Sequence, residues 1–515
     1  MTRADKIDQL RSREPWDILV IGGGATGLGS AVDAASRGYR TLLIEAHDFA
    51  QATSSRSTKL IHGGVRYLAQ GNLGLVREAL HERGVLLRNA PHLVHELAFV
   101  VPCRSRWSLA YYGLGLKAYD WLSGSQSIGR SRRLGRDETV RLLPTILGDS
   151  LAGGILYRDG QFDDARMAVA LAGTAEREGA VVVNYVQATG FRHRLDRVVG
   201  VLARDAETGE TFEIEAKAII NATGVFADEV RRLEDPSAKP AVRPSQGSHI
   251  VLDRSFLPGE TALMIPKTDD GRVLFAIPWL GRVLVGTTDA PVERPEIEPT
   301  PRAEEVEFLL SHLGRYLAKR PDRSDARSVF AGLRPLLAAS GGRATSRLSR
   351  EHAVLVSRAG LITITGGKWT TYRRMAADAL AKAVERADLP RRLCVTDSLH
   401  LKGWTDRPDS GFAARYGADA ECLRKLSSER PEWSEPIHLA LPYLKAEVIW
   451  GARHESARTV EDVLARRTRA LMLDARAASE AAPAVADLMA EQLGRDDAWK
   501  VRQVREFREL AGRWM

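Results

Sequence analysis

Short apolar runs alternate with longer amphipathic stretches through most of the chain. Residues 17–21 read Asp-Ile-Leu-Val-Ile, residues 41–44 read Thr-Leu-Leu-Ile, and residues 361–365 read Leu-Ile-Thr-Ile-Thr. Runs of this length, rich in β-branched residues, are typical of buried parallel strands. Residues 25–37 place small residues at helical spacing and stop before Gly38, which is suited to end a helix. The pattern therefore predicts an α/β fold that opens with a strand, a helix and a second strand.

The middle of the chain predicts more elements of both kinds. Glu207-Thr208-Gly209 is expected to form a hairpin turn, and Thr300-Pro301 is a good helix start. Expected strands cover residues 154–156, 181–185, 198–204, 211–214, 218–220, 273–277 and 283–285, and expected helices cover residues 164–179 and 304–317. From about residue 390 the patterns become rich in Arg, Glu and Ala. Thr459-Val460-Glu461-Asp462 has the sequence of a capping box, and residues 484–493 continue the helical spacing, so we expect a helical C-terminal domain.

One apolar stretch, residues 107–122, is rich in Trp and Tyr and has basic flanks. The flanking arginines are Arg104, Arg106, Arg130, Arg132 and Arg133. Aromatic residues with basic neighbours suit a membrane interface, but a buried helix has the same pattern. We favour the buried helix and leave the interface open.

Length and composition limit the class of protein. The 515 residues predict about three domains, and 44% apolar with 27% charged residues is ordinary for a soluble globular chain. The 74 Lys and Arg against 66 Asp and Glu give a formal charge of +8. That excess suits a phosphorylated substrate, an anionic membrane or nucleic acid. Because the basic residues are spread along the chain, a protein acting on nucleic acid is disfavoured.

The cysteines indicate a reducing compartment. Cys103, Cys394 and Cys422 are few and far apart, so no disulfide framework is expected. There is no C-x-x-C, which argues against a zinc ribbon or an iron–sulfur cluster, and we expect no metal site. Residues 1–14 lack the apolar core of a signal peptide, and no run of 18 apolar residues occurs. We therefore expect a cytoplasmic protein without a membrane-spanning helix.

A dinucleotide-binding fingerprint stands between the first two strands. Gly22, Gly24 and Gly27 form G-x-G-x-x-G, and Glu45 ends the second strand. The glycines allow the tight turn, the approach of a pyrophosphate and close helix packing, while the acidic residue suits a ribose hydroxyl. A hydroxyl-rich loop from Thr53 to Lys59 follows, where a plain NAD domain would normally have a helix.

This loop continues as Leu-Ile-His-Gly-Gly-Val-Arg-Tyr to Tyr67. Residues 17–27 and 53–68 resemble the FAD-dependent glycerol-3-phosphate dehydrogenases, and the resemblance extends along most of the chain. Further shared segments are residues 159–166, 221–224, 247–249, 286–289, 331–335, 365–372 and 458–469. The resemblance implies a Rossmann-like FAD-binding domain of the D-amino-acid-oxidase-like type with an interleaved α+β substrate or cap domain. It implies oxidation of sn-glycerol 3-phosphate to dihydroxyacetone phosphate, with hydride passing from C2 to N5 of FAD.

The expected domains are interleaved along the chain. The FAD-binding domain is expected in residues 1–70, 151–232 and 328–389. The substrate or cap domain is expected in residues 71–150 and 233–327. An all-helical C-terminal domain is expected in residues 390–515.

Three kinds of group are needed at such a site: cations for the phosphate, a base for the hydroxyl proton and groups that hold FAD. Arg334 lies among apolar neighbours and therefore needs a partner. The resemblance places Arg66, Tyr67 and Arg334 at the substrate, and Lys368, which follows Gly366-Gly367, beside both substrate and flavin. His62 and His249 are both candidate bases, and the sequence does not choose between them. The predicted contacts of FAD are Gly22, Gly24, Gly27, Glu45, Ser54, Ser55, Ser57, Lys59, His62, Gly63, Gly224, Gly366, Gly367, Lys368, Thr370 and Thr371.

The electrons leave through an acceptor that the sequence only narrows. Without a cysteine cluster the chain departs from the multi-subunit anaerobic members of the family, so membrane quinone or oxygen remains. No insertion of the kind that the oxidase relatives carry is evident, which favours quinone and a peripheral position on the inner face of the cytoplasmic membrane. Two alternative activities stay open: a glycerol-3-phosphate oxidase and a flavin oxidase of amino or 2-hydroxy acids. A homodimer also stays open.

Overall fold

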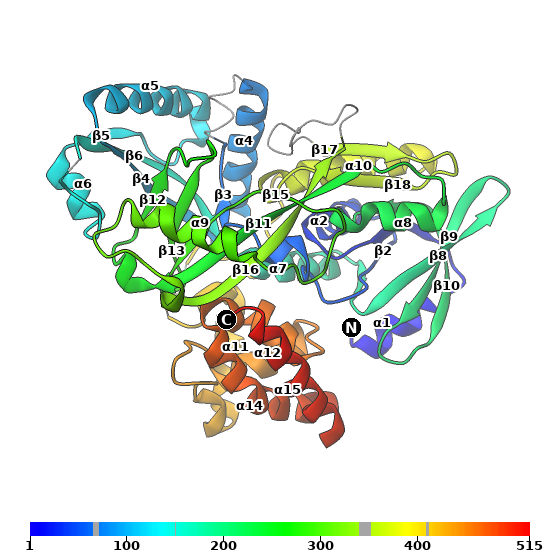
Figure 1. The fold of residues 1–515 in the computed structure, drawn as a ribbon. Coiled ribbons are helices and arrows are strands. Elements are labelled where there is room, and N and C mark those ends of the chain that lie inside the picture. Colours follow the sequence, from blue (N-terminus) through cyan, green and yellow to red (C-terminus); the bar gives the residue numbers. More distant parts are fainter. Residues whose placement is uncertain (65–71, 150, 339–351, 408–410) are drawn as a thin grey trace.

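The computed structural model describes residues 1–64, 72–149, 151–338, 352–407 and 411–515. Two sheets lie side by side, and a helical C-terminal region packs below them (Figure 1). The α/β class, the two interleaved parts and the helical C-terminal region agree with the sequence prediction.

The first sheet carries the N-terminal fingerprint. Its parallel core has the order β18, β10, β1, β2, β7, and β17 pairs antiparallel with β18. Within the described residues its strands are β1 (Trp16–Ile21), β2 (Thr41–Ile44), β7 (Val181–Val183), β8 (Val186–Arg194), β9 (Arg197–Asp205), β10 (Thr211–Asn221), β17 (His352–Val356) and β18 (Ile362–Gly366). Two strands expected at residues 211–214 and 218–220 are one continuous strand, β10, because its first half pairs with β9 and its second half with β1.

Helices that belong to this sheet are α1 (Arg3–Leu10), α2 (Ala25–Ser36), α7 (Asp164–Arg177), α8 (Ala227–Glu234) and α10 (Tyr372–Arg386). Apolar side chains of β1 and β2 are fully buried against α2, α7 and α10. Gly29 on α2 lets α10 approach, since a Cβ there would lie 2.6 Å from the Tyr372 ring. This packing fixes the start of α2 at the carboxyl end of β1.

The second sheet is mixed and mostly antiparallel. Within the described residues it has the order β15, β11, β14, β13, β12, β4, β6, β3, with β16 paired to β11 and β5 to β6. Its strands are β3 (Leu60–Ile61), β4 (Val94–Cys103), β5 (Arg132–Leu134), β6 (Gly153–Phe162), β11 (Val242–Asp253), β12 (Thr261–Ile265), β13 (Leu274–Trp279), β14 (Arg282–Gly286), β15 (Ala290–Pro291) and β16 (Ala326–Leu337). β3, β6 and β16 fall in segments that the sequence assigned to the FAD-binding part, so the segments interleave more closely than expected. The domain bounds themselves stay a prediction.

Helix α5 packs beside β4, β5 and β6 of this sheet (Figure 1), and its two faces differ in exposure. The helices of this part are α4 (Leu73–Asn89), α5 (Arg106–Ser123), α6 (Arg136–Leu142) and α9 (Ala303–Gly314). Leu116 and Tyr119 of α5 are buried, whereas Trp107 and Trp121 are 79% and 76% exposed. The expectation of a buried helix is therefore wrong for one face of α5.

The C-terminal region consists of α11 (Ala420–Glu429), α12 (Lys445–His454), α13 (Ala470–Leu473), α14 (Ala475–Leu493) and α15 (Asp497–Gly512). The expected capping box is present: Thr459 Oγ1 accepts a hydrogen bond from the Asp462 N–H, and Asp462 Oδ2 accepts one from the Thr459 N–H. Apolar residues of α13, α14 and α15 share one core with the second sheet, whereas those of α11 form a separate cluster with residues of α12. None of the helices in the described ranges combines the length and the apolar composition needed to cross a bilayer.

Candidate active site

A cavity of about 480 Å³ lies at the carboxyl ends of β1, β10 and β18. This is the edge of a parallel sheet at which α/β proteins bind ligands. Five predicted glycines line it: Gly22, Gly24, Gly224, Gly366 and Gly367. The three strands that the sequence placed at a dinucleotide thus meet at one cavity.

The fingerprint glycines leave no room for side chains. Gly22 has φ +112°, a conformation that residues with a Cβ rarely adopt, and a Cβ on Gly24 would lie 3.1 Å from Ser54 Oγ. Gly27 packs directly against the Gly22 carbonyl. Ser54 Oγ accepts a hydrogen bond of 3.0 Å from the Ala25 N–H at the start of α2. The turn is therefore a backbone-lined cradle beside a helix N-terminus, which suits a pyrophosphate.

Glu45 lines the same cavity and is tied to the turn. Its carboxylate accepts hydrogen bonds from the N–H groups of Gly23 and His47. Burial raises the pKa of Glu45, and those two hydrogen bonds oppose the shift. Its predicted contact with a ribose stays a prediction.

A second cavity of about 270 Å³ adjoins the first and shares Thr53, Pro335, Gly367, Lys368 and Trp369 with it. It lies against the second sheet. His62, His249, Arg334, Lys368, Thr370 and Ser57 line it together with Asp159 and the aromatic residues Phe99, Tyr157 and Phe275. Residues predicted from four separate segments therefore surround one space.

Arg334 on β16 is fixed by several acceptors. Its Nη2 donates to Thr287 Oγ1 at 2.9 Å and to the Thr288 carbonyl at 3.0 Å, and its Nη1 lies 3.4 Å from Asp289 Oδ1. Its neighbours Leu333 and Leu336 are buried, so the need for a partner is confirmed. Thr288 and Asp289 thus shape the site by holding this guanidinium.

His249 on β11 lies beneath the second cavity and is 2% exposed. Its Nε2 is 2.9 Å from Thr58 Oγ1, and its ring stacks on Phe330. Burial, followed by the charges of Lys59 and Arg334, holds the pKa of His249 well below the ordinary histidine value. Gly286 on the facing strand is required, because a Cβ there would lie 2.7 Å from His249 Nε2. The site therefore holds a neutral imidazole.

Several predicted cofactor residues point elsewhere. Lys59 Nζ is fully buried and donates to Asp164 Oδ2 at 2.7 Å and to the Ser55 carbonyl at 2.9 Å. Ser57 Oγ donates to the same carboxylate at 2.7 Å. Lys59 and Ser55 line neither cavity, because their polar groups are engaged beneath the loop. The sequence indicated a hydroxyl-rich loop, but the composition of a loop does not predict which of its side chains face a ligand.

The remaining predicted residues divide between the cavities and their surroundings. Gly63 lines neither cavity, and its N–H donates to Asp159 Oδ1 at 3.3 Å. Thr371 borders a separate recess beside Lys368. Lys368 precedes a single 3-10 turn, Trp369–Thr371, that leads into α10. The predictions for Arg66 and Tyr67 fall outside the described residues.

Two acidic residues that the sequence did not single out support the site. Glu305 on α9 accepts hydrogen bonds from Thr288 Oγ1 at 2.5 Å and Gln246 Nε2 at 2.7 Å, and so braces the loop that holds Arg334. Asp159 accepts from Arg83 Nη1 at 2.9 Å and Tyr119 OH at 3.0 Å. Each of these two carboxylates joins segments that are distant in the sequence, and a local sequence pattern does not predict such contacts.

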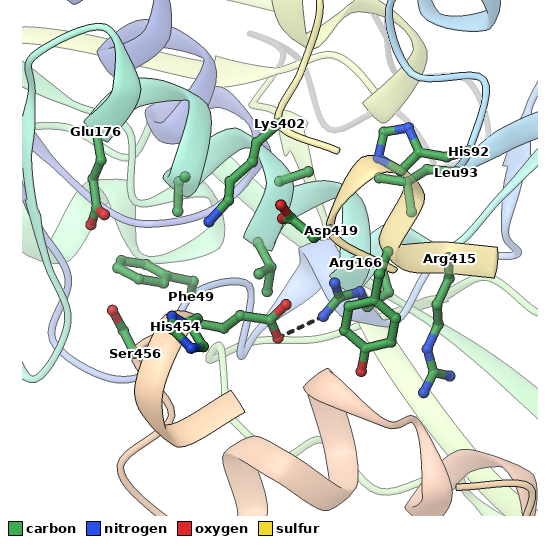
Figure 2. A pocket seen from close by; sticks show the side chains of 16 residues that line it. Phe49, His92, Leu93, Arg166, Glu176, Lys402, Arg415, Asp419, His454 and Ser456 are labelled. Carbon is green, nitrogen blue, oxygen red and sulfur yellow. Dashed lines mark hydrogen bonds and ion pairs between the residues drawn. The ribbon is translucent and has the colours of Figure 1, made fainter. Parts of the chain in front are cut away.

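A third pocket lies between α7 and the C-terminal region (Figure 2), and it shares no lining residue with either cavity. Its volume of about 30 Å³ is room for about one water molecule. Two residues that line it, Arg166 and Glu455, form an ion pair of 2.7 Å. This pocket marks a polar contact that attaches α12 to the FAD-binding part.

Comparisons with known proteins decide what the two cavities belong to. A family model described as FAD dependent oxidoreductase matches residues 17–373, and one described as the C-terminal domain of alpha-glycerophosphate oxidase matches residues 358–500. The human mitochondrial glycerol-3-phosphate dehydrogenase is 39% identical over 99% of this chain and 75% of its own length. The chain belongs to the FAD-dependent glycerol-3-phosphate dehydrogenases.

Two further members of this family support the assignment over the whole length. The mitochondrial glycerol-3-phosphate dehydrogenase SDP6 of Arabidopsis thaliana is 38% identical over 96% of this chain and 86% of its own length. The crystal structure of the Bacillus halodurans glycerol-3-phosphate dehydrogenase in complex with FAD superposes with a TM-score of 0.81, at 29% identity, covering 99% of this chain and 98% of that one. The resemblance inferred from the sequence motifs is confirmed, and so is FAD as the cofactor.

The residues present in this glycerol-3-phosphate dehydrogenase family member fit FAD. The glycine cradle of the first cavity has no side chain in the way, and the cavity continues past Gly367 and Lys368 into the second cavity. A ligand with a long shape and a central pyrophosphate matches that arrangement. The cradle would hold the pyrophosphate, and the Gly366-Gly367 segment lies where the two cavities meet.

Proposed function

We propose that this protein oxidises sn-glycerol 3-phosphate to dihydroxyacetone phosphate and passes the electrons to membrane quinone. The observation that carries the proposal is the grouping of Arg334, Lys368 and His249 around one cavity that adjoins the glycine cradle. FAD supplies the acceptor for the hydride that leaves C2 of the substrate. The remaining work falls to the side chains of this chain.

Arg334 and Lys368 hold the phosphate in this proposal. A guanidinium fixed by Thr287, Thr288 and Asp289 is already oriented, so little conformational entropy is lost when it binds an oxyanion. With the phosphate held at one end, the small substrate keeps its C2 hydroxyl at a fixed place in the cavity. Arg66 and Tyr67 remain predicted contacts of the same group.

His249 accepts the hydroxyl proton. A base must be unprotonated at the working pH. Because the pKa of His249 is lowered, its ring stays neutral at pH values below the pKa of an ordinary histidine. His62 lines the same cavity and is the second candidate. Burial and the contact with Thr58 support His249 as the base.

Molecular oxygen is the competing acceptor, because the C-terminal part matches a domain described from alpha-glycerophosphate oxidase. We expect turnover of glycerol 3-phosphate with a soluble quinone analogue in air to reduce the quinone and to release little hydrogen peroxide. The measurement is quinone absorbance and peroxide yield in the same sample. One peroxide per substrate, unaffected by quinone, would instead make the protein an oxidase.

The exposed face of α5 supports docking on a membrane that contains the quinone. Trp107, Tyr111, Leu114 and Trp121 are 61–79% exposed and recur at helical spacing on one side. Arg106 starts the helix, and Arg130 and Arg132 follow it. Tryptophan and tyrosine with basic neighbours are the composition of a helix that lies in a lipid interface.

Replacing three of these residues is expected to release the protein from lipid. We predict that Trp107→Ser, Leu114→Ser and Trp121→Ser together lower binding to anionic vesicles about tenfold or more, since each loses apolar area from the interface. Co-sedimentation measures it. The matched control is the triple variant Leu195→Ser, Leu393→Ser and Leu439→Ser. These leucines lie outside α5 and are 87–96% exposed. Equal binding by both triple variants would refute docking through α5.

A further inference from the structure

Lys59 is a buried cation for which the proposed reaction has no use so far. It is 0% exposed, and its backbone has φ +61° where the loop enters β3. Its ammonium is held between Asp164 Oδ2 at 2.7 Å and the Ser55 carbonyl at 2.9 Å. A lysine is rarely buried in this way unless it is paired, because its charge must leave water.

Asp164 serves two cations at once. Besides Lys59, its carboxylate accepts from Arg469 Nη2 at 3.0 Å, from the Ala165 N–H at 2.9 Å and from Ser57. Arg469 comes from the C-terminal region and also donates to the Ser55 carbonyl at 2.7 Å. One carboxylate shared by two cations leaves Lys59 only partly neutralised by its partner.

The Phe330 ring is close to both the Lys59 ammonium and the His249 imidazole. Lys59 Nζ lies 5.5 Å from the ring centroids of Trp279 and Phe330, and the Phe330 ring stacks on the His249 ring with centroids 4.8 Å apart. These distances place the ammonium no more than about 10 Å from the imidazole, with little water between them because all these groups are buried. Thr58 is the residue before Lys59, and its Oγ1 lies 2.9 Å from Nε2 of the same imidazole.

We propose that Lys59 is an electrostatic positioning residue whose buried positive charge keeps the His249 imidazole deprotonated at acidic pH, where an ordinary histidine would already carry a proton. The inference rests on the proposed function, because it gives Lys59 a role toward the proposed base. It also assigns a task to the contact between the loop of residues 53–59 and the C-terminal region: Arg469 holds the carboxylate that fixes Lys59.

The charges around the pair act in a consistent direction. The positive charges of Lys59 and Arg334 both lower the pKa of His249, and the charged groups that act on Lys59 are Asp164, Arg469 and Asp163. Burial, partly offset by Asp164, lowers the pKa of Lys59 to about 7, so the ammonium is charged on the acid side of neutrality. An ordinary histidine takes up its proton in that same range. Lys59 therefore disfavours protonation of His249 in the pH range in which an ordinary histidine would become charged.

The test compares Lys59→Met with Arg469→Met by the pH dependence of anaerobic flavin reduction by glycerol 3-phosphate. Each variant removes one cation from Asp164, so a merely structural loss would change both profiles alike. We expect Lys59→Met to move the acid limb to higher pH by on the order of one unit, the size of a single charge effect at this distance. Arg469→Met should leave the limb in place or move it to lower pH, since Arg469 lowers the pKa of Lys59. An unmoved limb in Lys59→Met, or equal shifts in both variants, overturns the proposal.

A second readout does not depend on turnover. With isotope-labelled histidine and the His249→Asn variant for assignment, NMR follows the protonation of His249 directly. The midpoint should be higher in Lys59→Met than in the unaltered protein by on the order of one pH unit, and equal midpoints would contradict the inference. If glycerol 3-phosphate fails to reduce the unaltered protein, the proposed function is lost while this measurement still decides the role of Lys59. Lys59→Gln, which keeps a donor for Ser55 and Asp164, replaces Lys59→Met if the latter does not retain FAD.

Discussion

Arg334→Met is expected to raise the KM for glycerol 3-phosphate by about 10² to 10³, with a smaller loss in kcat. The guanidinium is held at the cavity by Thr287, Thr288 and Asp289. Methionine keeps the apolar stem and removes the charge that a phosphate would meet. Steady-state kinetics over a wide range of substrate concentration gives both constants.

Two comparisons separate phosphate binding from general damage. Arg282→Met changes an arginine of similar exposure, 22% against 23%, on the same sheet, and it should leave the KM unchanged. Glycerol, which has no phosphate, should be oxidised equally poorly by the unaltered protein and by Arg334→Met. An Arg334→Met protein that still prefers glycerol 3-phosphate to glycerol by the original factor would show that another group binds the phosphate.

His249→Asn is expected to slow flavin reduction by glycerol 3-phosphate by about 10² to 10⁴, the usual contribution of a positioned base. Asparagine keeps a polar side chain beside Thr58 but cannot take up a proton. His62→Asn should slow the same step far less. Anaerobic stopped-flow measurements at saturating substrate report the step without interference from reoxidation.

The pH dependence of flavin reduction tests the assignment of His249 as the base independently of the substitution. The pKa of His249 is lowered, so the base stays deprotonated as the pH falls through the range in which an ordinary histidine gains a proton. The unaltered protein should therefore keep its rate of flavin reduction below the ordinary histidine pKa. An unchanged rate in His249→Asn would exclude it as the base and leave His62.

The parts of the fold that local patterns encode could be predicted from the sequence. The strand, glycine turn and helix at residues 16–36 and the capping box at Thr459 depend on neighbours within a few residues. The glycine-rich segments near Gly224 and Gly366 could be assigned to the same ligand because each follows a buried parallel strand. Their meeting at one cavity is a consequence of parallel pairing.

Pairings between distant segments could not be predicted. Nothing local in residues 326–337 shows that β16 joins β11 rather than the first sheet. The apolar pattern of α5 fitted both a buried and an exposed helix, because the pattern alone does not show which side packs. The Lys59–Asp164–Arg469 cluster joins residues as many as 305 positions apart in its hydrogen bonds. A lysine in a serine-rich loop therefore gave a cofactor contact as the expectation, whereas the structure turns it toward a buried carboxylate.

The most direct test of the central claim is a single anaerobic turnover. FAD-loaded protein mixed with sn-glycerol 3-phosphate should lose the absorbance of oxidised flavin and form one dihydroxyacetone phosphate for each flavin reduced. Persistence of the oxidised band with glycerol 3-phosphate, together with its loss on adding an amino acid or a 2-hydroxy acid, would contradict the proposed substrate.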